Sequence, residues 1–191
     1  MKTIKTIILV ALIFSLGTSF ASGKTISVFD GFVTPIEFLN VKKGHQLIIK
    51  DSNDNVVYTE NIQNSGTYTK GFDFAELQNG TYSVELVKDF EIIIKPFVIK
   101  EGRVMFLTDL ETKLFKPHAR LKNNKLMVSQ LVLNNEPLKI ELYYNDTIIY
   151  KEDINGDKNL NRIYRLSETE KGYYNIVMVS GGRVFSETYK M

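Results

Sequence analysis

Oxygen-bearing side chains alternate along one polar stretch of the chain, DINGDKNLN. Asp153, Asn155 and Asp157 stand at every second position, as ligands do in the first half of a calcium-binding loop. A complete helix-loop-helix site also needs glycine at its sixth position and a bidentate carboxylate at its twelfth, where this chain has Lys158 and Tyr164. We therefore interpret the stretch as a solvated turn between two strands, and calcium at the three oxygen-bearing residues is the alternative.

Residues suited to acid-base or nucleophilic catalysis are few. The chain has no cysteine and only two histidines, His45 and His118, and we expect each at a surface or at a boundary between elements. It contains no glycine-rich phosphate loop, no GxSxG elbow and no histidine pair at metal spacing. The carboxylates are scattered singly, although folding can bring two together as in glycosidases. We therefore predict no enzyme and no cofactor, with a small carboxylate-based hydrolase as the less favoured alternative.

Two tyrosine doublets are the candidate binding residues. Because side chains of a strand alternate between its faces, one member of each doublet is expected on the outer face of a sheet. Exposed tyrosine is common at binding surfaces, since it presents a large contact area at small entropic cost. Tyr143, Tyr144 and Tyr173 are the candidates for surface binding. A cross-strand aromatic pair that only stabilises the sheet is the competing explanation.

The elements that must position these residues are strands. Nearly every segment after the first 21 residues alternates apolar and polar residues with a period of two, as in PIEFLNV, TYSVELV and FEIIIKPFVIK. No window longer than about ten residues has convincing helical periodicity. The sequence therefore predicts an all-β fold.

The chain contains an internal repeat. At an offset of 92 residues, NDNVVYTENI aligns with NDTIIYKEDI, and LQNGTYSVELV aligns with TEKGYYNIVMV. Tyr58 meets Tyr150, Gly80 meets Gly172, and apolar positions meet apolar positions around these identities. Order and spacing are kept together, so we infer two copies of one β unit. Each copy has the length of an immunoglobulin-like sandwich of about seven strands.

These observations predict three regions. Residues 1–21 have the basic start, short apolar core and small-x-small end of a cleaved signal peptide. Residues 22–102 form the first repeat. Residues 103–191 form the second, including an inter-domain hairpin segment at 103–117. KEGR carries the glycine of a tight hairpin, so the strand after it is expected to pair back onto the strand before it.

Charge and targeting restrict the partners. Without the two lysines of the predicted signal peptide, 22 basic side chains face 22 acidic ones, since that segment has no Asp or Glu. Nucleic-acid binders normally carry a basic surplus, so we expect no nucleic-acid partner. We also expect no membrane span after signal cleavage. The mature protein is predicted to be exported, to the periplasm, the cell surface or the extracellular space.

Part of each copy resembles a known family. The stretch FDFAELQNGTYSVELV is similar to the L-x-x-G-x-Y-x-V-x-V segment of type IX secretion C-terminal sorting domains and related small sandwich modules of exported Bacteroidetes proteins. Leu77, Gly80, Tyr82, Val84 and Leu86 match that segment in the first copy. The counterparts in the second copy are Gly172, Tyr174, Ile176 and Met178. The hairpin glycine and lysine of the family pattern are missing in both copies.

Two functions remain in view. The leading expectation is a non-catalytic exported protein that acts as a binding, adhesion or scaffolding module for an unknown protein or glycan at the cell envelope. The resemblance implies the alternative, a sorting-domain-like protein of the type IX pathway.

Overall fold

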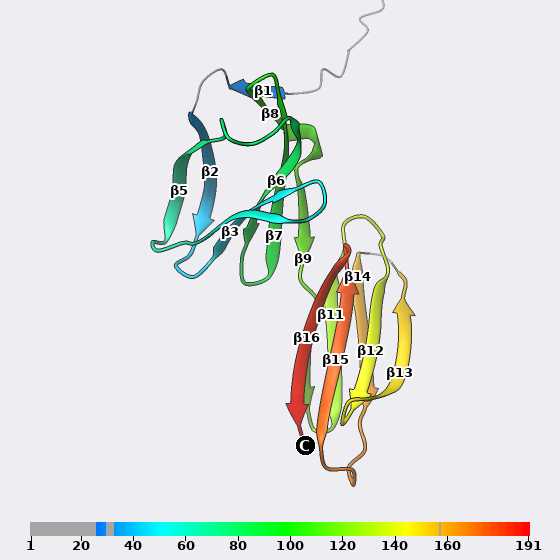
Figure 1. Ribbon diagram of the computed structural model, residues 1–191. Helices are drawn as coiled ribbons and strands as arrows, with labels where there is room; N and C mark the ends of the chain where they lie inside the picture. Colours follow the sequence, from blue (N-terminus) through cyan, green and yellow to red (C-terminus); the bar gives the residue numbers. More distant parts are fainter. Residues whose placement is uncertain (1–25, 30–32, 157) are drawn as a thin grey trace, which may run out of the picture.

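The chain folds into strands arranged in two successive lobes (Figure 1). The structure is a computed structural model that describes residues 26–29, 33–156 and 158–191. The predicted signal peptide at 1–21 lies outside the described residues. The elements are β1 (Ile26–Phe29), β2 (Val33–Val41), β3 (Gln46–Asp51), β4 (Val56–Asn61), β5 (Gly66–Asp73), β6 (Gly80–Val87), β7 (Glu91–Lys100), β8 (Arg103–Leu107), the 3₁₀ helix η1 (Thr108–Leu110), β9 (Thr112–Phe115), β10 (His118–Lys122), β11 (Lys125–Leu131), β12 (Leu138–Tyr144), β13 (Thr147–Ile154), β14 (Asn159–Arg165), β15 (Tyr173–Ser180) and β16 (Arg183–Lys190).

Strands β1 to β9 form the first domain, a sandwich of two antiparallel sheets. The larger sheet has the order β1-β8-β7-β6-β3-β4, and β9 also pairs with β7. The second sheet consists of β2 and β5. Strands β10 to β16 form the second domain, with sheets β10-β11-β14 and β13-β12-β15-β16. The predicted all-β fold with tandem sandwiches is confirmed.

The internal repeat is a repeat of this sandwich. Strands β4, β6 and β7 correspond at an offset of 92 residues to β13, β15 and β16, and β3 pairs with β4 and β6 as β12 pairs with β13 and β15. The strand between these partners, β3 in the first copy and β12 in the second, corresponds at an offset that is one residue larger. Ile49 pairs with Tyr58 and Val84, whereas Leu142 pairs with Tyr150 and Ile176. The second copy therefore closes this hairpin with one residue fewer.

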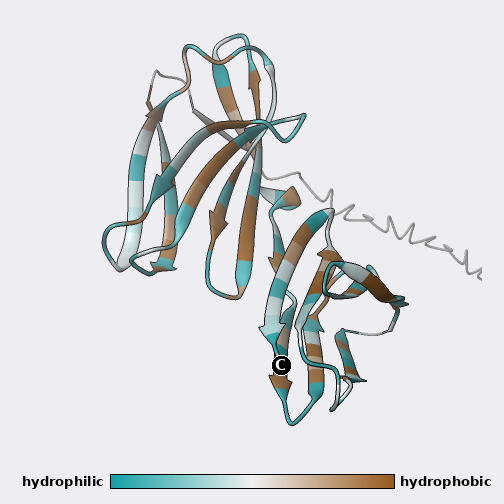
Figure 2. Ribbon diagram, turned by 60° about the horizontal axis from the view of Figure 1, so that its bottom comes forward, coloured by the Kyte–Doolittle hydropathy of each residue, from teal (hydrophilic) through white to brown (hydrophobic). Residues whose placement is uncertain are grey.

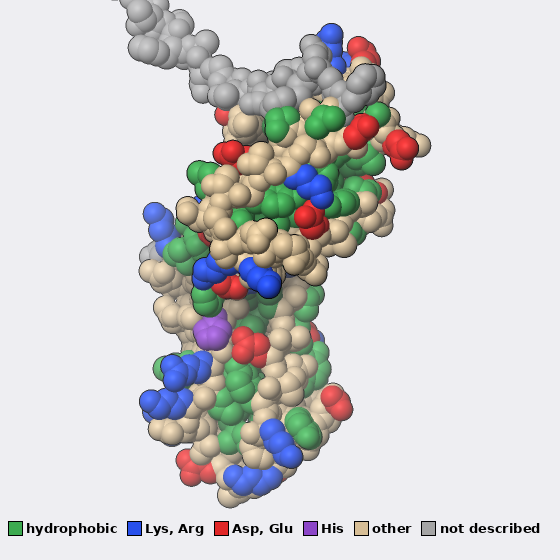
Figure 3. Space-filling model, turned by 90° about the vertical axis from the view of Figure 1, so that its left-hand side faces the viewer, with side chains coloured by type: hydrophobic (Ala, Val, Ile, Leu, Met, Phe, Trp, Pro, Cys, Tyr) green, Lys and Arg blue, Asp and Glu red, His purple; other side chains and the backbone are tan. Residues whose placement is uncertain are grey.

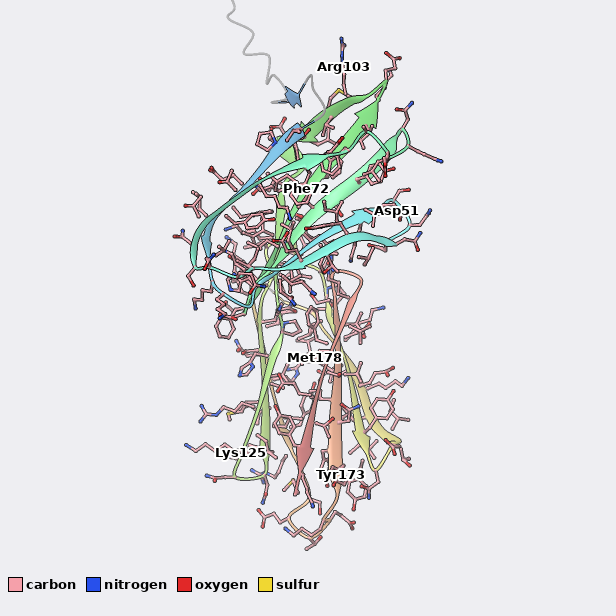
Figure 4. All side chains as sticks on the ribbon, turned by 60° about the vertical axis from the view of Figure 1, so that its left-hand side comes forward. Asp51, Phe72, Arg103, Lys125, Tyr173 and Met178 are labelled. Carbon is pink, nitrogen blue, oxygen red and sulfur yellow. The ribbon has the colours of Figure 1, made fainter. Side chains whose placement is uncertain are left out.

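Each domain has its own hydrophobic core, because the inward-facing residues of its two sheets pack against each other. Figure 2 shows hydrophobic positions along the strands of both lobes. Leu47, Val84 and Phe97 are completely buried in the first core. Ile176 and Met178 are completely buried in the second. Figure 4 shows Phe72 in the first lobe and Met178 in the second, at the end of that lobe nearer the first domain. The two cores share no residue, so either can be altered separately.

The hairpin segment that the sequence analysis placed with the second repeat contributes its strands to the first sheet. KEGR makes the expected tight turn, with Glu101 at φ 52° and Gly102 at φ 74°, and Lys100 pairs with Arg103. β8 then pairs with β7 and β1, and β9 pairs with the other half of β7. β7 is longer than its neighbours and has room for both partners, which is why residues 103–115 extend the first domain.

The glycine and tyrosine of the repeated segment have roles that differ between the copies. Tyr82 is buried and its hydroxyl donates a hydrogen bond to the Gln78 carbonyl at 2.9 Å, as expected for a tyrosine at a sandwich corner. Gly172 is required by close approach, because a Cβ there would lie 2.6 Å from Asn145 Oδ1. At Gly80 a Cβ would make only ordinary contacts.

The domains meet through a buried charge cluster. Glu85 lies on β6, only 2% exposed, and points away from the first core. Its carboxylate lies 3.5 Å from Lys50 Nζ and 2.5 Å from Arg183 of the second domain. Ser180, the last residue of β15, and Gly181, in the turn before β16, lie beside β9, and Leu114 packs against Gly181. The turn between β15 and β16 is therefore seated against the first sheet.

Among the residues that the structure describes, no helix has the length and apolar character needed to cross a membrane.

Candidate binding surfaces

The outer face of the sheet formed by β13, β12, β15 and β16 holds two of the three predicted tyrosines. Tyr143 lies on β12 and is half-buried, and Tyr173 begins β15 with 54% of its surface exposed. Figure 4 shows Tyr173 near the end of the second lobe that lies away from the first domain. Alternation along the strands places both rings on the side of the sheet opposite the core.

Tyr144, the third predicted tyrosine, points to the opposite face. Its ring lies 4.9 Å from that of buried Tyr174, and its hydroxyl donates to the Lys171 carbonyl at 3.0 Å. Burial raises the pKa of Tyr144, with Glu170 adding to the effect. This side chain closes the end of the core and forms a cross-strand pair with Tyr174.

Tyr143 on β12 is held in place by a hydrogen bond to a charged neighbour. The Tyr143 hydroxyl donates to Glu141 at 2.6 Å, and Lys151 Nζ donates to the same carboxylate at 2.8 Å. The hydrogen bond from Lys151 lowers the pKa of Glu141, and the bond to Glu141 raises the pKa of Tyr143. Near neutral pH Tyr143 therefore stays protonated with a fixed hydroxyl direction.

Neighbouring strands add groups that the sequence analysis did not select. Lys190 on β16 pairs with Tyr173 and places its ammonium 5.6 Å from the centre of that ring. Thr188 donates a hydrogen bond to Asn175, 3.4 Å away. The period-two alternation of β15 and β16 predicts that these side chains point to one face of each strand. It does not predict that the two strands are neighbours in the sheet. Together they form a row of aromatic, amide, hydroxyl and ammonium groups, here called the tyrosine face.

The tyrosine face has a counterpart in the first domain. By strand register, Tyr143 and Val177 occupy the places of Lys50 and Glu85. In the first domain this place meets the second domain, because Arg183 contacts Glu85, and Lys50 lies beside the same carboxylate. The same face of the second domain contacts no further domain in the described part of the chain.

The calcium alternative falls on the end of β13 and the connection that follows it. Asp153 lies within β13, opposite Lys139, and Asn155 directs its side-chain amide to the Asp153 carbonyl at 3.2 Å. Asp157 lies outside the described residues. In the described part of the chain, His, Cys, Asp and Glu form no group of three able to hold a metal ion.

The two histidines lie in different domains and have different environments. His45 lies directly before β3, at one of the boundaries expected for it, but it is only 5% exposed, and its Nδ1 accepts a hydrogen bond from the Lys42 amide at 3.0 Å. The chain turns back at Gly44, so the imidazole is folded over this turn. His118 is exposed, with Nδ1 3.6 Å from Glu187.

One pocket, of about 240 Å³, brings together two carboxylates between β2, β7 and β8. Glu111 lies 3.8 Å from Lys95, and Glu37 accepts a weak hydrogen bond from Thr69 at 3.4 Å. The Lys95 ammonium also donates to the Glu37 carbonyl. The two acids are thus engaged by different partners, with a cation at one of them, whereas glycoside hydrolysis needs them directed at one bond.

A second cluster of titratable groups closes the side of the first sandwich between β4 and β5. Glu60 lies 2.5 Å from Lys70 and accepts hydrogen bonds from Tyr58 and Tyr68. Lys70 is the main cause of the lowered pKa of Glu60, and Tyr58 adds to it. In the second domain the repeat places Glu152 beside Arg162 and Tyr164. The cluster satisfies its own charges, which indicates a structural role.

Charges of both signs are interspersed over the face shown in Figure 3. This distribution agrees with the near-neutral composition and differs from the continuous basic stripe typical of nucleic-acid binders.

Comparison with known proteins supports the resemblance noted in the sequence. Residues 32–100, which span β2 to β7, match the family model described as secretion system C-terminal sorting domain. A comparison with curated proteins gives no match. The family match covers most of the first sandwich and supports a secreted protein of the cell envelope, related to type IX secretion.

Proposed function

We propose that the protein is a non-catalytic binding module of the cell envelope, and that the tyrosine face recognises a protein or glycan. The observation that carries this proposal is the difference between the two copies. The outer face that the first domain turns to its neighbour is not covered by any described residue of another domain in the second copy, where it carries Tyr143 in the place of Lys50 and Tyr173 in the place of Thr81. Aromatic rings beside amide and hydroxyl groups suit both protein and glycan surfaces.

Envelope binding tests the proposal. The chain from residue 22 to 191 is labelled and titrated onto isolated envelopes of the native cells. We expect the double variant Tyr143→Ser, Tyr173→Ser to bind at least 10-fold more weakly, because the aromatic anchors of an interface carry most of its energy. Tyr150→Ser is the matched control, since Tyr150 is 46% exposed on the same sheet but packs against Tyr164 on the other side. Equal binding by the double variant, or no binding by the unaltered chain, contradicts the proposal.

The family match favours a second candidate function, delivery across the outer membrane by the type IX pathway. Under this candidate the first domain presents the sorting signal. We expect the chain to be found outside the outer membrane in normal cells and to accumulate in the periplasm when the secretion channel is deleted. Immunoblots of fractionated cells measure this, with a periplasmic protein as the marker. Retention of the whole population in the periplasm of normal cells contradicts the candidate.

A further inference from the structure

Strand β9 forms one wall of a groove between the domains. The opposite wall is the end of β11 and the chain that follows it, from Leu131 to Asn134, and Ser180 and Gly181 also line the groove. This part of the groove has a volume of about 290 Å³. It continues past Lys113 into a wider part of about 500 Å³. In Figure 1, β9 descends from the first lobe towards the second with its outer side uncovered by another strand.

The backbone of β9 directs unpaired groups into this groove. In an antiparallel pair, alternate residues direct both their N–H and C=O groups to the partner strand. The Lys116 amide donates to the Phe90 carbonyl, and the register continues with Leu114 opposite Ile92. The N–H and C=O groups of Leu114 therefore point to β7, and those of Lys113, one residue before it, point into the groove. No described residue pairs with the N–H or C=O of Lys113, so an open strand edge is available.

A buried side chain confirms the direction of this edge and adds an acceptor to it. Gln130 is 5% exposed, and its Nε2 donates to the Phe115 carbonyl at 2.8 Å and to Ser180 Oγ at 2.7 Å. The backbone carbonyl of Phe115 therefore points into the groove, as the alternation of backbone groups from Lys113 requires. The Gln130 Oε1 atom is buried without a donor from the described residues. A buried carbonyl oxygen needs a hydrogen-bond donor, and Gln130 lines the groove.

Part of the lining of the groove is apolar, although Asn134 and Glu136 also line it. Leu133 is 57% exposed and Leu131 is 37% exposed, and both line the groove together with Ile94 and Leu114. Side chains of an added strand alternate between two directions, so every second residue of a bound peptide would meet these walls. The complement is a short extended segment with apolar residues at alternate positions.

We propose that this groove binds an extended apolar peptide by strand addition to β9. The backbone of the peptide pairs with Lys113, one of its N–H groups reaches Gln130 Oε1, and alternate side chains lie against Leu131 and Leu133. β9 lies between the two repeats and is not part of the duplicated unit, so its edge is an addition to the sandwich. Backbone pairing supplies affinity in such complexes, and the side-chain contacts supply selectivity. This site is separate from the tyrosine face.

Lys113→Pro is the decisive variant. Proline removes the N–H that faces the groove, whereas pairing with β7 uses Thr112 and Leu114. A phage-displayed library of 12-residue peptides is selected on the chain from residue 22 to 191. We expect the selected peptides to show alternating apolar residues and to bind Lys113→Pro at least 10-fold more weakly. Lys113→Ala keeps the backbone donor and should bind within 2-fold of the unaltered chain.

A second measurement does not depend on the folding of the proline variant. Amide exchange is followed by NMR in the unaltered chain with and without a selected peptide. We expect the Lys113 amide to exchange at least 10-fold more slowly in the complex. The proposal is overturned if no peptide is enriched, if selected peptides bind the folded proline variant equally well, or if exchange at Lys113 is unchanged.

Discussion

Replacing Phe97 with alanine lowers the free energy of unfolding of the first domain by about 3 to 5 kcal/mol. Phe97 is completely buried, and its ring lies 5.1 to 5.4 Å from those of Phe74, Tyr82 and Phe106. Alanine removes the centre of this aromatic cluster and leaves a cavity that the rigid sheets cannot close. Hydrogen exchange measured by mass spectrometry reads each domain separately. We expect protection to fall in β6 and β7 and to persist in β12 and β15.

The second domain supplies the matched control. Met178 is also completely buried, and Met178→Ala is expected to cost its own domain about 2 to 5 kcal/mol. The loss of protection should then appear in β12 and β15 only. If either substitution unfolds both domains together, the two cores are not independent, and the two sandwiches unfold as one cooperative unit.

Replacing Arg183 with methionine weakens the docking of the two domains by about 3 kcal/mol. Arg183 is the partner that the second domain supplies to Glu85, and removing one member of a buried pair leaves the other uncompensated. Lys50 remains 3.5 Å away but belongs to the first domain, so it cannot hold the domains together. The carboxylate regains water most easily if the domains separate. Small-angle X-ray scattering should therefore show a larger radius of gyration, while the secondary structure is retained.

The compensating variant tests the cause. Glu85→Leu combined with Arg183→Met replaces the charges with apolar side chains of similar size, and such replacements of buried pairs are often neutral or stabilising. We expect the radius of gyration of the double variant to return to that of the unaltered protein. A radius that is unchanged in Arg183→Met alone would show that other contacts, such as Gln130 with Phe115, fix the domains.

The turn between β3 and β4 is an example of a feature that the local sequence determines. In DSNDN, between β3 and β4, Asp51 Oδ1 accepts hydrogen bonds from the amides of Asn53 and Asn55 at 2.8 and 2.9 Å. Asp54 adopts φ 62°, a conformation that aspartate and asparagine tolerate. Such features depend on a few consecutive residues, so the sequence contains all the information needed.

The candidate binding residues were only partly accessible from sequence. Alternation correctly divides each tyrosine doublet between two faces, but it does not tell which member points outward. That depends on which face of the sheet the second sheet of the sandwich covers: in β12 this is the face of Leu138, Ile140 and Leu142, so Tyr143 points outward. The groove beside β9 was not predicted, because its walls come from segments separated by about 20 to 70 residues that meet only after both domains have folded.

By itself the sequence determined the all-β character, the duplication and the composition of the two cores, because alternation and repeat spacing are properties of the chain. The tertiary structure alone decided which strands pair and which outward faces are covered. β1 and β10 hold equivalent places in the repeat, yet β1 pairs with β8 and β10 pairs with β11. The physical reason is that backbone hydrogen bonds are alike for every strand, so the partner is chosen by the segments that packing brings to its edge.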